Sequence, residues 1–401
     1  MKLSIKGDLS MKWIHTSDLH IGKMFNDFSL LEDQKFFLDQ LTRFAVEQKA
    51  DAVVIAGDLY DRSVPSAEAV EVLGNFLCRM TLEENIPVLA IAGNHDSPQR
   101  LDFGSELMRR SGLYLAGKYH KRFNKVTLND SFGPVHFYLS PYLEPALVRL
   151  DFPEESIRTY DEAFQRVLQE NRKDIDSKER NVFVGHGFFS YLKNPDSVAR
   201  SESEVSLGGS DLIDASGLSI FDYAALGHIH RPQQTGEEKI RYSGSPLVYS
   251  LSEIPFAKSV SVVELKEKGD LSIETVSLPV LRKTRIIEGY FDEIMTHSPL
   301  SQGTDDLVYF SLSDHVLVPN AMNRLRAIYP NALGMRLRSS TQSDIDIPAQ
   351  HTAKPIDQLF ADFFESINER KLTSEQQRII ESVGKTVLSG GDADETDSSG
   401  I

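Results

Sequence analysis

The stretch WIHTSDLH, residues 13–20, is a short apolar run that ends in polar residues. A helical pattern over about residues 27–49 follows it, and the next apolar run, DAVVIAGDLY (51–60), contains β-branched residues and reaches Gly57. A second helical pattern, about residues 66–84, leads into IPVLAIAGNHD (86–96). Strand patterns that alternate with helical patterns predict βαβ units and a parallel sheet.

The same series continues as far as about residue 280. Strand patterns lie at 135–142 and 181–186, with a helical stretch around 161–171 between them, and others follow at 221–230 and 239–250. The segment SVSVVELKEKGDLSIETVSL (259–278) resembles a hairpin that turns at Lys268-Gly269-Asp270. We therefore expect one large α/β domain over residues 11–278.

Pro279 is the expected boundary of this domain. Strand patterns at 284–291, 306–314 and 332–340, with a helical pattern at 320–330, predict a small α+β unit over residues 281–346. The linker DIPAQHTAKP (346–355) leads to two amphipathic helices within 354–388, and the acidic tail 389–401 has the composition of a disordered segment. Such a helix face serves either as core or as a docking surface for a partner. On the first of these helices it comprises Leu359, Phe360, Phe363 and Phe364.

Composition and charge set limits on the class of protein. No apolar run approaches the roughly 20 residues that span a bilayer, and the N-terminus lacks the apolar region of a secretory signal. The single cysteine, Cys78, fits a reducing cytoplasm and lies in an apolar helical pattern, where we expect it to pack. The net charge of −16 argues against non-specific nucleic-acid binding at face value, but an acidic tail and a carboxylate-rich metal site both contribute to it. The net charge therefore does not decide whether the protein binds nucleic acid. Met11 directly precedes the first strand pattern, which leaves residues 1–10 as a candidate dispensable extension.

Five of the strand patterns end in Asp, Asn or His. In four of them a glycine comes directly before the polar residue, which permits a sharp turn and close backbone approach. In the first, two polar residues stand two positions apart, so a strand end would aim both to one side. Because ligands bind at the carboxyl ends of strands in open α/β sheets, we expect the polar groups to converge in one crevice. They are Asp18, His20, Asp58, Asn94, His186, His228 and His230.

This set of side chains predicts a metal centre. Imidazole, carboxylate and amide oxygen together suit divalent transition ions such as manganese, iron or zinc. The absence of cysteine from the set argues against a structural zinc site. Seven ligands exceed what one ion needs but suffice for two when one carboxylate bridges, and two ions about 3.5–4 Å apart form the clamp used for displacement at phosphorus. Each short motif alone is more often an ordinary polar strand end, whereas all five in order predict a two-metal phosphoesterase.

The five motifs are DLH (18–20), GDLYD (57–61), GNHD (93–96), GH (185–186) and GHIH (227–230). In this order they closely resemble the calcineurin-like metallophosphoesterase superfamily over about the first 250 residues. The contexts HTSDLHIGK, GDLYDRSVPS, GNHDSPQRL and GHIHRPQ narrow the resemblance to the nuclease subunits of bacterial SbcCD complexes. That resemblance continues through the α+β unit and the segment KPIDQLFADFFESINERKLTSEQ, so it covers nearly the whole chain. It implies an αββα fold, a β-sandwich flanked by helices, with a small capping domain and C-terminal helices.

The resemblance also implies roles for individual residues. One ion, most suitably Mn²⁺, would be held by Asp18, His20, Asp58 and His230. The other would be held by Asp58, Asn94, His186 and His228, with Asp58 bridging. His95 would be catalytic and not a ligand, because beside Asn94 it can contact the scissile phosphate and protonate or stabilise the leaving 3′ oxygen. Asp61 and Asp96 would orient ligand histidines or His95.

The implied function is that of a metal-dependent DNA nuclease in DNA end processing, repair, recombination and replication. It would combine 3′-to-5′ exonuclease activity on duplex DNA with endonuclease activity on single strands and hairpins. The partner would be an SbcC-type ATPase, whose coiled-coil base would bind the C-terminal helices, with a homodimer of this chain inside a heterotetramer. The chain itself contains no G-x-x-x-x-G-K-[ST], which agrees with nucleotide binding by the partner. The expected location is the bacterial cytoplasm, on the nucleoid when DNA is bound.

Two other functions stay open on the sequence alone. A phosphatase or phosphodiesterase for small substrates would use the same metal centre, although the long C-terminal region counts against it. A catalytically dead scaffold would have lost ligands, and none is missing here. Candidate DNA contacts are basic residues near the site or in the small unit, each of which is also compatible with ordinary solvated surface. They are Arg100, Arg109 and Arg110 near the site, and Arg324, Arg326, Arg336 and Arg338 in the small unit.

Overall fold

The computed structural model describes residues 10–26, 28–191, 211–296, 304–314, 316, 318–338, 372–373 and 376–377. The described residues up to 338 belong to one compact unit. Most of the expected N-terminal extension, the expected C-terminal helices apart from 372–373 and 376–377, and the acidic tail lie outside the described residues. No helix of the described ranges is long and apolar enough to cross a membrane.

The first sheet contains the three strands that the opening motifs predicted. Its parallel part runs β1, β4, β5 and β6, and β15 and β16 extend it in antiparallel pairing beyond β1. The expected hairpin is confirmed, because Lys266 N–H donates to the carbonyl of Asp270 across its turn. In sheet order the strands are β16 (Leu271–Val276), β15 (Val260–Leu265), β1 (Met11–Thr16), β4 (Ala52–Ile55), β5 (Val88–Ile91) and β6 (Leu113–Ala116).

The later strand patterns form a second sheet instead of continuing the first. Here too the central strands are parallel, with an antiparallel strand at each edge. The strand patterns therefore predicted the parallel pairing, and the division into two sheets agrees with the β-sandwich that the resemblance implies. Periodicity within one strand does not by itself specify the neighbours of that strand. In sheet order the strands are β13 (Gln233–Thr235), β14 (Glu237–Tyr242), β12 (Tyr223–Gly227), β9 (Arg180–His186), β8 (Gly133–Ser140) and β7 (Asn124–Asp130).

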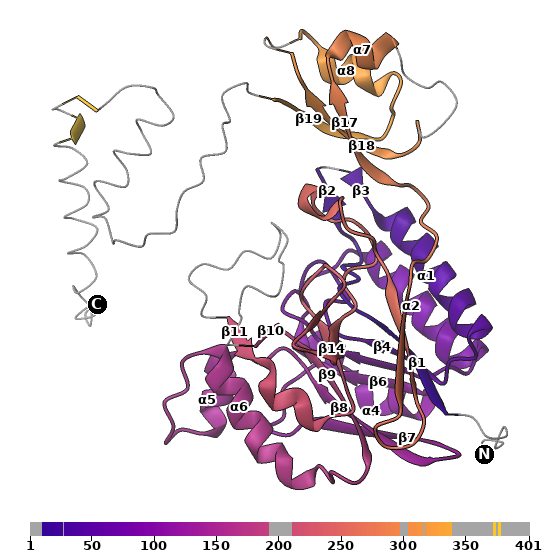
Figure 1. The fold of residues 1–401 in the computed structure, drawn as a ribbon, viewed down its shortest axis with the longest axis vertical. Coiled ribbons are helices and arrows are strands. Elements are labelled where there is room, and N and C mark those ends of the chain that lie inside the picture. Colours follow the sequence, from indigo (N-terminus) through magenta and orange to yellow (C-terminus); the bar gives the residue numbers. More distant parts are fainter. Residues whose placement is uncertain are drawn as a thin grey trace, which may run out of the picture. The chain divides into compact units, whose positions relative to one another are not determined.

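The two sheets pack face to face through a core of large side chains. Trp13 of the first sheet has ring-centroid distances of 5.5 Å to Phe137 and 5.7 Å to Tyr223 of the second. Strand alternation sends Trp13 into this central core and its neighbour Ile14 to the opposite face, under the helices. The αββα layering implied by the resemblance is thus confirmed, and Figure 1 shows α1 and α2 on one side of the strands and α5 and α6 on the other.

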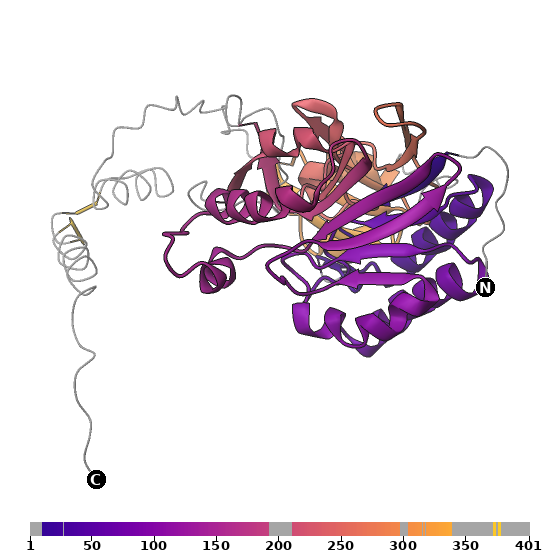
Figure 2. The ribbon, with the colours of Figure 1, turned by 90° about the horizontal axis from the view of Figure 1, so that it is seen from below.

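The helices cover the outer faces of the two sheets, and the same layers are seen from below in Figure 2. The helix predicted over 27–49 begins later, because Met24–Phe25 and Phe28–Ser29 form the small β2–β3 hairpin. Cys78 is exposed at the end of α2, so the expectation that it packs is wrong; the buried stripe of α2 contains Leu73 and Phe76 instead. The helices are α1 (Leu31–Glu47), α2 (Ala67–Cys78, continued by a π-helical turn at Arg79–Glu83), α3 (Pro98–Asp102), α4 (Ser105–Met108), α5 (Pro145–Asp151) and α6 (Tyr160–Asn171). The short strands β10 (Phe188–Ser190) and β11 (Leu212–Asp214) pair in parallel.

Within residues 281–338, the part that the structure describes forms a three-stranded parallel sheet with two short helices. The strands are β17 (Thr284–Gly289), β18 (Leu307–Leu312) and β19 (Ala332–Leu337), and the helices are α7 (Phe291–Thr296) and α8 (Ala321–Arg326). Helix α7 has no counterpart in the sequence prediction. Leu307 and Leu333 of this unit share a buried cluster with Phe25 and Tyr249, and Arg282 donates to Asp33 of α1. This unit therefore packs directly on elements next to the predicted metal centre.

Candidate metal centre

Asp18 and His20 follow β1 in a loop whose backbone is left-handed at both residues. Their φ angles are +54° and +45°, which side chains other than glycine rarely adopt. The strand itself ends at Thr16, so the two side chains are not aimed by strand alternation as the sequence suggested. Backbone bonds from Asp18 N–H to Gly57 carbonyl (3.0 Å) and from His20 N–H to Asp58 carbonyl (2.9 Å) hold the loop against the end of β4. Strained backbone of this kind is concentrated at functional sites.

Glycines let the ligand-bearing loops approach one another. A Cβ on Gly57 would lie 2.2 Å from His186 Nδ1, and a Cβ on Gly93 would lie 2.1 Å from Asp58 Oδ1. A Cβ on Gly227 would lie 1.9 Å from the carbonyl oxygen of Ala56, where the two sheets meet. Gly57, Gly93 and Gly227 are therefore required by close approach across the site.

The structure brings all seven predicted ligands together at the carboxyl ends of strands from both sheets. Asp58 lies at the middle: its Oδ2 is 3.5 Å from His20 Nε2 and 3.4 Å from His186 Nε2. Asn94 Oδ1 is 3.0 Å from both His186 Nε2 and His228 Nδ1. His230 Nε2 lies 3.2 Å from His20 Nε2, and Asp18 Oδ1 accepts the backbone N–H of His228 at 2.9 Å. The groups Asp18–His20–His230 and Asp18–Asp58–His186 each have ligand atoms close enough for one ion.

The hydrogen bonds on the outer side of the imidazoles test whether cations fit. His186 Nδ1 lies 2.8 Å from the carbonyl of Ala56, which only accepts, so this nitrogen carries the proton. In the neutral imidazole, Nε2 then presents a lone pair toward Asp58 Oδ2 and Asn94 Oδ1, which are acceptors themselves. His230 Nδ1 similarly faces a carboxylate, that of Glu253, at 3.0 Å. Lone pairs that face one another at these distances repel unless a proton or a metal cation lies between them. The residues therefore fit a metal centre.

Glu253 is a functional residue that the sequence analysis missed. It is fully buried beside His230, and Lys258 Nζ donates to its Oε2 at 2.6 Å. Gln34 of α1 supports the other side of the site, because its Nε2 donates to the carbonyl of His20 at 2.7 Å. Tyr249 contacts both His20 and His230 edge-on, with centroid distances of 5.5 Å and 5.8 Å. These residues stand singly in their segments and belong to no spaced motif, so nothing in the linear sequence distinguished them.

Asp61 and Asp96 brace the ligand loops in different ways. Asp61 Oδ1 lies 3.5 Å from His20 Nδ1 and forms an ion pair with Lys23 Nζ at 2.8 Å. Asp96 accepts the backbone N–H groups of Leu59, Tyr60 and Gly93 at 2.9–3.0 Å. The carboxylate of Asp96 therefore ties together the loops that carry Asp58 and Asn94, and its contacts are with backbone instead of the imidazole that we expected.

His95 lies in the same crevice, and it contacts Asp58 through its backbone and not through its ring. Its backbone N–H donates to Asp58 Oδ1, and its Nδ1 donates to the carbonyl of Asp61 at 2.9 Å. The ring packs edge-on to His20 with a centroid distance of 4.7 Å. Nε2 is therefore the nitrogen left to meet a substrate, and the catalytic role of His95 stays a prediction.

Burial and charge perturb the titratable groups strongly. Burial opposes a proton on His186, but the carboxylate of Asp58 outweighs it and raises the pKa of His186 to about 9. Burial and the neighbouring His186 lower the pKa of His228 to about 3. Burial together with the Asp58 charge raises the pKa of Asp96 to about 6. Although burial acts the other way, His20 and Lys23 lower the pKa of Asp61 to about 2.

The site opens on the side of Asn94, His95 and His228, where Asn94 is exposed and the two histidines are half-buried. Arg100 is exposed on α3, in the segment that follows the ligand loop after β5. Arg110 is also exposed, but it directly precedes β6, which runs parallel to β5, so it lies at the opposite, amino end of these strands and not near the site as we expected. Arg109 instead donates to Asn124 at 2.7 Å and lies over the ring of Tyr114. In the small unit Arg324 covers Phe291, and Arg338 pairs with Glu288 at 3.3 Å. Arg336 Nε lies 3.5 Å from Ser311 Oγ, and Arg326 is exposed on α8.

Comparison with known proteins agrees with this geometry. The family model of the calcineurin-like phosphoesterases matches residues 11–232, which is more than half of the chain. The chain therefore belongs to the calcineurin-like phosphoesterase family, as the five motifs predicted. Membership implies a divalent-metal site and phosphoester hydrolysis, and the described residues supply the corresponding groups of metal-binding side chains.

Two bacterial relatives are similar along most of their length, and both are the D component of the nuclease SbcCD. The one from Staphylococcus epidermidis is 33% identical over 325 residues, covering 81% of this chain and 85% of that protein. The one from Staphylococcus saprophyticus is 32% identical over 388 residues, covering 95% of this chain and 100% of that protein. A second family model, the type 5 capsule protein repressor C-terminal domain, matches residues 280–368. The resemblance to this nuclease family is thus confirmed well beyond the metal centre.

Proposed function

We propose that this chain is the nuclease subunit of a DNA-processing complex and hydrolyses phosphodiester bonds with two divalent cations, Mn²⁺ for preference. Its activities would be 3′-to-5′ exonuclease on duplex DNA and endonuclease on single strands and hairpins. The proposal rests above all on the convergence of seven oxygen and nitrogen ligands around Asp58, together with full-length similarity to relatives named as nucleases. A phosphatase for small substrates does not account for the similarity over residues 280–368.

Each ligand has a distinct place in the proposed centre. Asp18, His20 and His230 would hold one cation, and Asn94, His186 and His228 the other, with Asp58 bridging. Bound there, the two cations would polarise the phosphoryl oxygens and lower the pKa of an attacking water. Glu253 and the carbonyl of Ala56 occupy the outer nitrogens of His230 and His186, so that the inner nitrogens would face the cations. Asp61 lies 3.5 Å from the outer nitrogen of His20.

His95 would act on the leaving oxygen. Because its Nδ1 proton is committed to the carbonyl of Asp61, any proton that it gives up to substrate leaves from Nε2. That nitrogen would have to be protonated before the bond to the 3′ oxygen breaks. In the same position the imidazolium would stabilise negative charge on the phosphoryl group.

Further parts of the chain would bind DNA and partners. The division that we propose is a nuclease domain at 11–278, a DNA-contacting cap at 281–346 and helices at 354–388 that dock on an SbcC-type ATPase. Arg100 is the best placed of the candidate DNA contacts near the motifs, since the guanidinium of Arg109 is engaged by Asn124 and Tyr114 and Arg110 lies at the amino end of β6. A chain that acts on bacterial chromosomal DNA would work in the cytoplasm, at the nucleoid.

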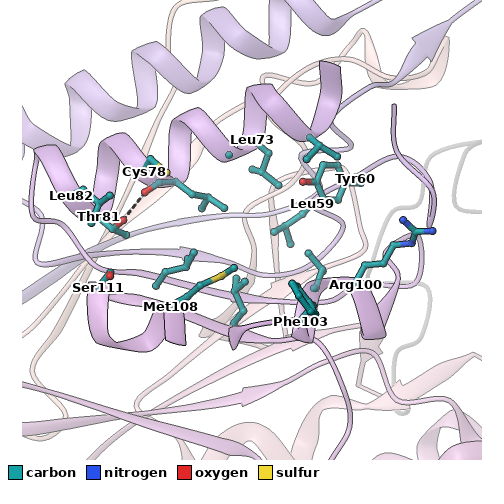
Figure 3. A pocket seen from close by; sticks show the side chains of 16 residues that line it. Leu59, Tyr60, Leu73, Cys78, Thr81, Leu82, Arg100, Phe103, Met108 and Ser111 are labelled. Atoms are coloured by element: carbon teal, nitrogen blue, oxygen red, sulfur yellow. Dashed lines mark hydrogen bonds between the residues drawn. The ribbon is translucent and has the colours of Figure 1, made fainter. Parts of the chain in front are cut away.

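An apolar groove beside α2 supports the proposed homodimer within the heterotetramer. This dimer groove, of about 420 Å³, lies between α2 and the α3–α4 segment and is lined by Leu73, Leu82, Phe103 and Met108 among others (Figure 3). The side chains of Phe103 and Leu82 are 81% and 60% exposed, and Leu107 of α4 is 74% exposed. Contiguous exposed apolar surface of this kind marks association sites, and a second copy of the same groove would cover it.

The proposal is tested by incubating the full-length protein with 5′-labelled duplex and hairpin DNA in Mn²⁺, with and without the ATPase partner and ATP. We expect stepwise shortening of the duplex and opening of the hairpin. Bis(p-nitrophenyl) phosphate, in the same buffer, reports the metal centre without DNA recognition. Hydrolysis of this small diester without cleavage of DNA under any condition would contradict the DNA assignment and favour the small-substrate alternative.

A further inference from the structure

Tyr142 lies beside the metal centre without any place in the motifs. It follows β8 by two residues, and its backbone N–H donates at 2.9 Å to the carbonyl of Ala92, directly before Gly93 and Asn94. Its ring lies near His228, at a centroid distance of 6.5 Å and an interplanar angle of 28°, and 6.2 Å from His186. The half-buried side chain of Tyr142 therefore borders the ligands proposed for the second cation.

A second aromatic residue holds Tyr142 in place. Tyr160, the first residue of α6, has its ring centroid 5.5 Å from that of Tyr142, at an interplanar angle of 43°. Tyr160 packs against the core under the second sheet, and the N-terminus of its helix is fixed by a capping box between Thr159 and Glu162. The ring of Tyr142 is thus supported by Tyr160 at the capped start of α6, and its backbone is held by the hydrogen bond to Ala92.

Tyr142 lies where it could contact a nucleoside of DNA bound at the open side of the site. A phosphodiester seated over Asn94, His95 and His228 carries a nucleoside on each side of the scissile phosphate. His228 lies at the mouth with Tyr142 as its stacked neighbour, so one of these nucleosides comes next to the tyrosine ring. Aromatic faces fixed in this way bind bases without regard to their sequence, because every base has a π-face.

We propose that Tyr142, supported by Tyr160, stacks on the base of a nucleotide that flanks the scissile phosphate and so positions the DNA strand on the metal centre. The inference rests on the proposed nuclease function and adds the contact that distinguishes a nucleotide strand from a bare phosphodiester. Tyr142 is a positioning residue in this scheme, since it touches the nucleotide next to the reacting bond and takes no proton. Single strands and hairpin loops, whose bases are unstacked, gain most from it.

Base removal tests the stacking directly. Short single-stranded oligonucleotides are compared that carry either a normal base or an abasic analogue in the nucleotide on the 5′ side or on the 3′ side of the cleaved bond. With Mn²⁺ we expect the wild-type protein to lose about tenfold in kcat/KM when the base at one of these two positions is absent. In Tyr142→Ala that difference is expected to disappear, whereas Tyr142→Phe keeps it because the ring remains.

Two controls separate this role from a structural one. Phe132→Ala removes a 42% exposed aromatic ring at the opposite end of β8 and should keep the full base dependence. The same oligonucleotides are also titrated for binding, where the same loss of base dependence is expected in Tyr142→Ala. An undiminished base dependence in Tyr142→Ala, or none in the wild-type protein, would overturn the inference. A wild-type protein that binds with base dependence but cleaves no DNA would instead contradict the proposed nuclease function.

Discussion

The imidazole of His95 is fixed through its Nδ1 contact with Asp61, which leaves Nε2 for the substrate. We expect His95→Asn to lower kcat by at least about 100-fold, because proton donation by a positioned side chain contributes factors of that size. Mn²⁺ binding, followed by calorimetry, should be unchanged, since no metal ligand is removed. Full hydrolysis by the variant would show that His95 has no catalytic part, and loss of Mn²⁺ would show that it is a ligand.

His186 makes metal binding dependent on pH. With its pKa raised to about 9, the imidazole of the metal-free protein is protonated at neutral pH, and a cation must displace that proton. The affinity for Mn²⁺ should therefore rise with pH by about tenfold per unit below pH 9, for one displaced proton. Calorimetric titrations between pH 6 and pH 8.5, in buffers of different ionisation enthalpy, measure both the affinity and the released proton. An affinity that stays constant over this range would rule out protonation of the ligand set.

Among the structural elements, the end of β12 and the segment that follows β4 approach each other closely at Gly227. An added Cβ there meets the backbone carbonyl of Ala56, which has no flexible end to give way. We expect Gly227→Ala to separate the two sheets at the site, to destabilise the fold by about 1–3 kcal/mol and to weaken Mn²⁺ binding. Thermal unfolding and calorimetry measure the two effects.

Gly74→Ala is the matched control, because a Cβ on Gly74 of α2 has no neighbour within 4 Å. That variant should bind Mn²⁺ as the wild type does. Normal metal affinity in Gly227→Ala would mean that close approach of the sheets does not set the ligand positions.

The elements also show what a sequence can and cannot predict here. Ligands such as Asp58 and Asn94 were predictable, because each directly follows an apolar strand and a glycine in one continuous segment. Glu253 was not, since its place beside His230 arises from a loop that returns across the sheet and has no pattern of its own. The late start of α1 has the same cause: Phe25 and Phe28 form a hairpin because they pack on Tyr249 and Leu307, which are far away in sequence. Local patterns thus predicted strands and their polar ends, while pairing between sheets depended on tertiary contacts.

At the scale of the whole molecule, the dimer groove predicts that the protein forms a homodimer through this surface. Phe103→Glu places a charge on an 81% exposed apolar residue at its rim and should convert a dimer to a monomer in light scattering. Leu150→Glu, at a residue of α5 that is 76% exposed, is the matched control and should leave the dimer intact. A dimer that persists in Phe103→Glu, or dissociates in Leu150→Glu, would place the interface elsewhere.

The central claim is that Asp18, His20, Asp58, Asn94, His186, His228 and His230 bind two cations with Asp58 between them. Counting bound Mn²⁺ by calorimetry and by elemental analysis of the dialysed protein tests this most directly. The account predicts two ions per chain for the wild type and fewer than two for Asp58→Asn, a substitution that keeps the size of this buried side chain. One ion or none in the wild type, or two ions of unchanged affinity in Asp58→Asn, would contradict it.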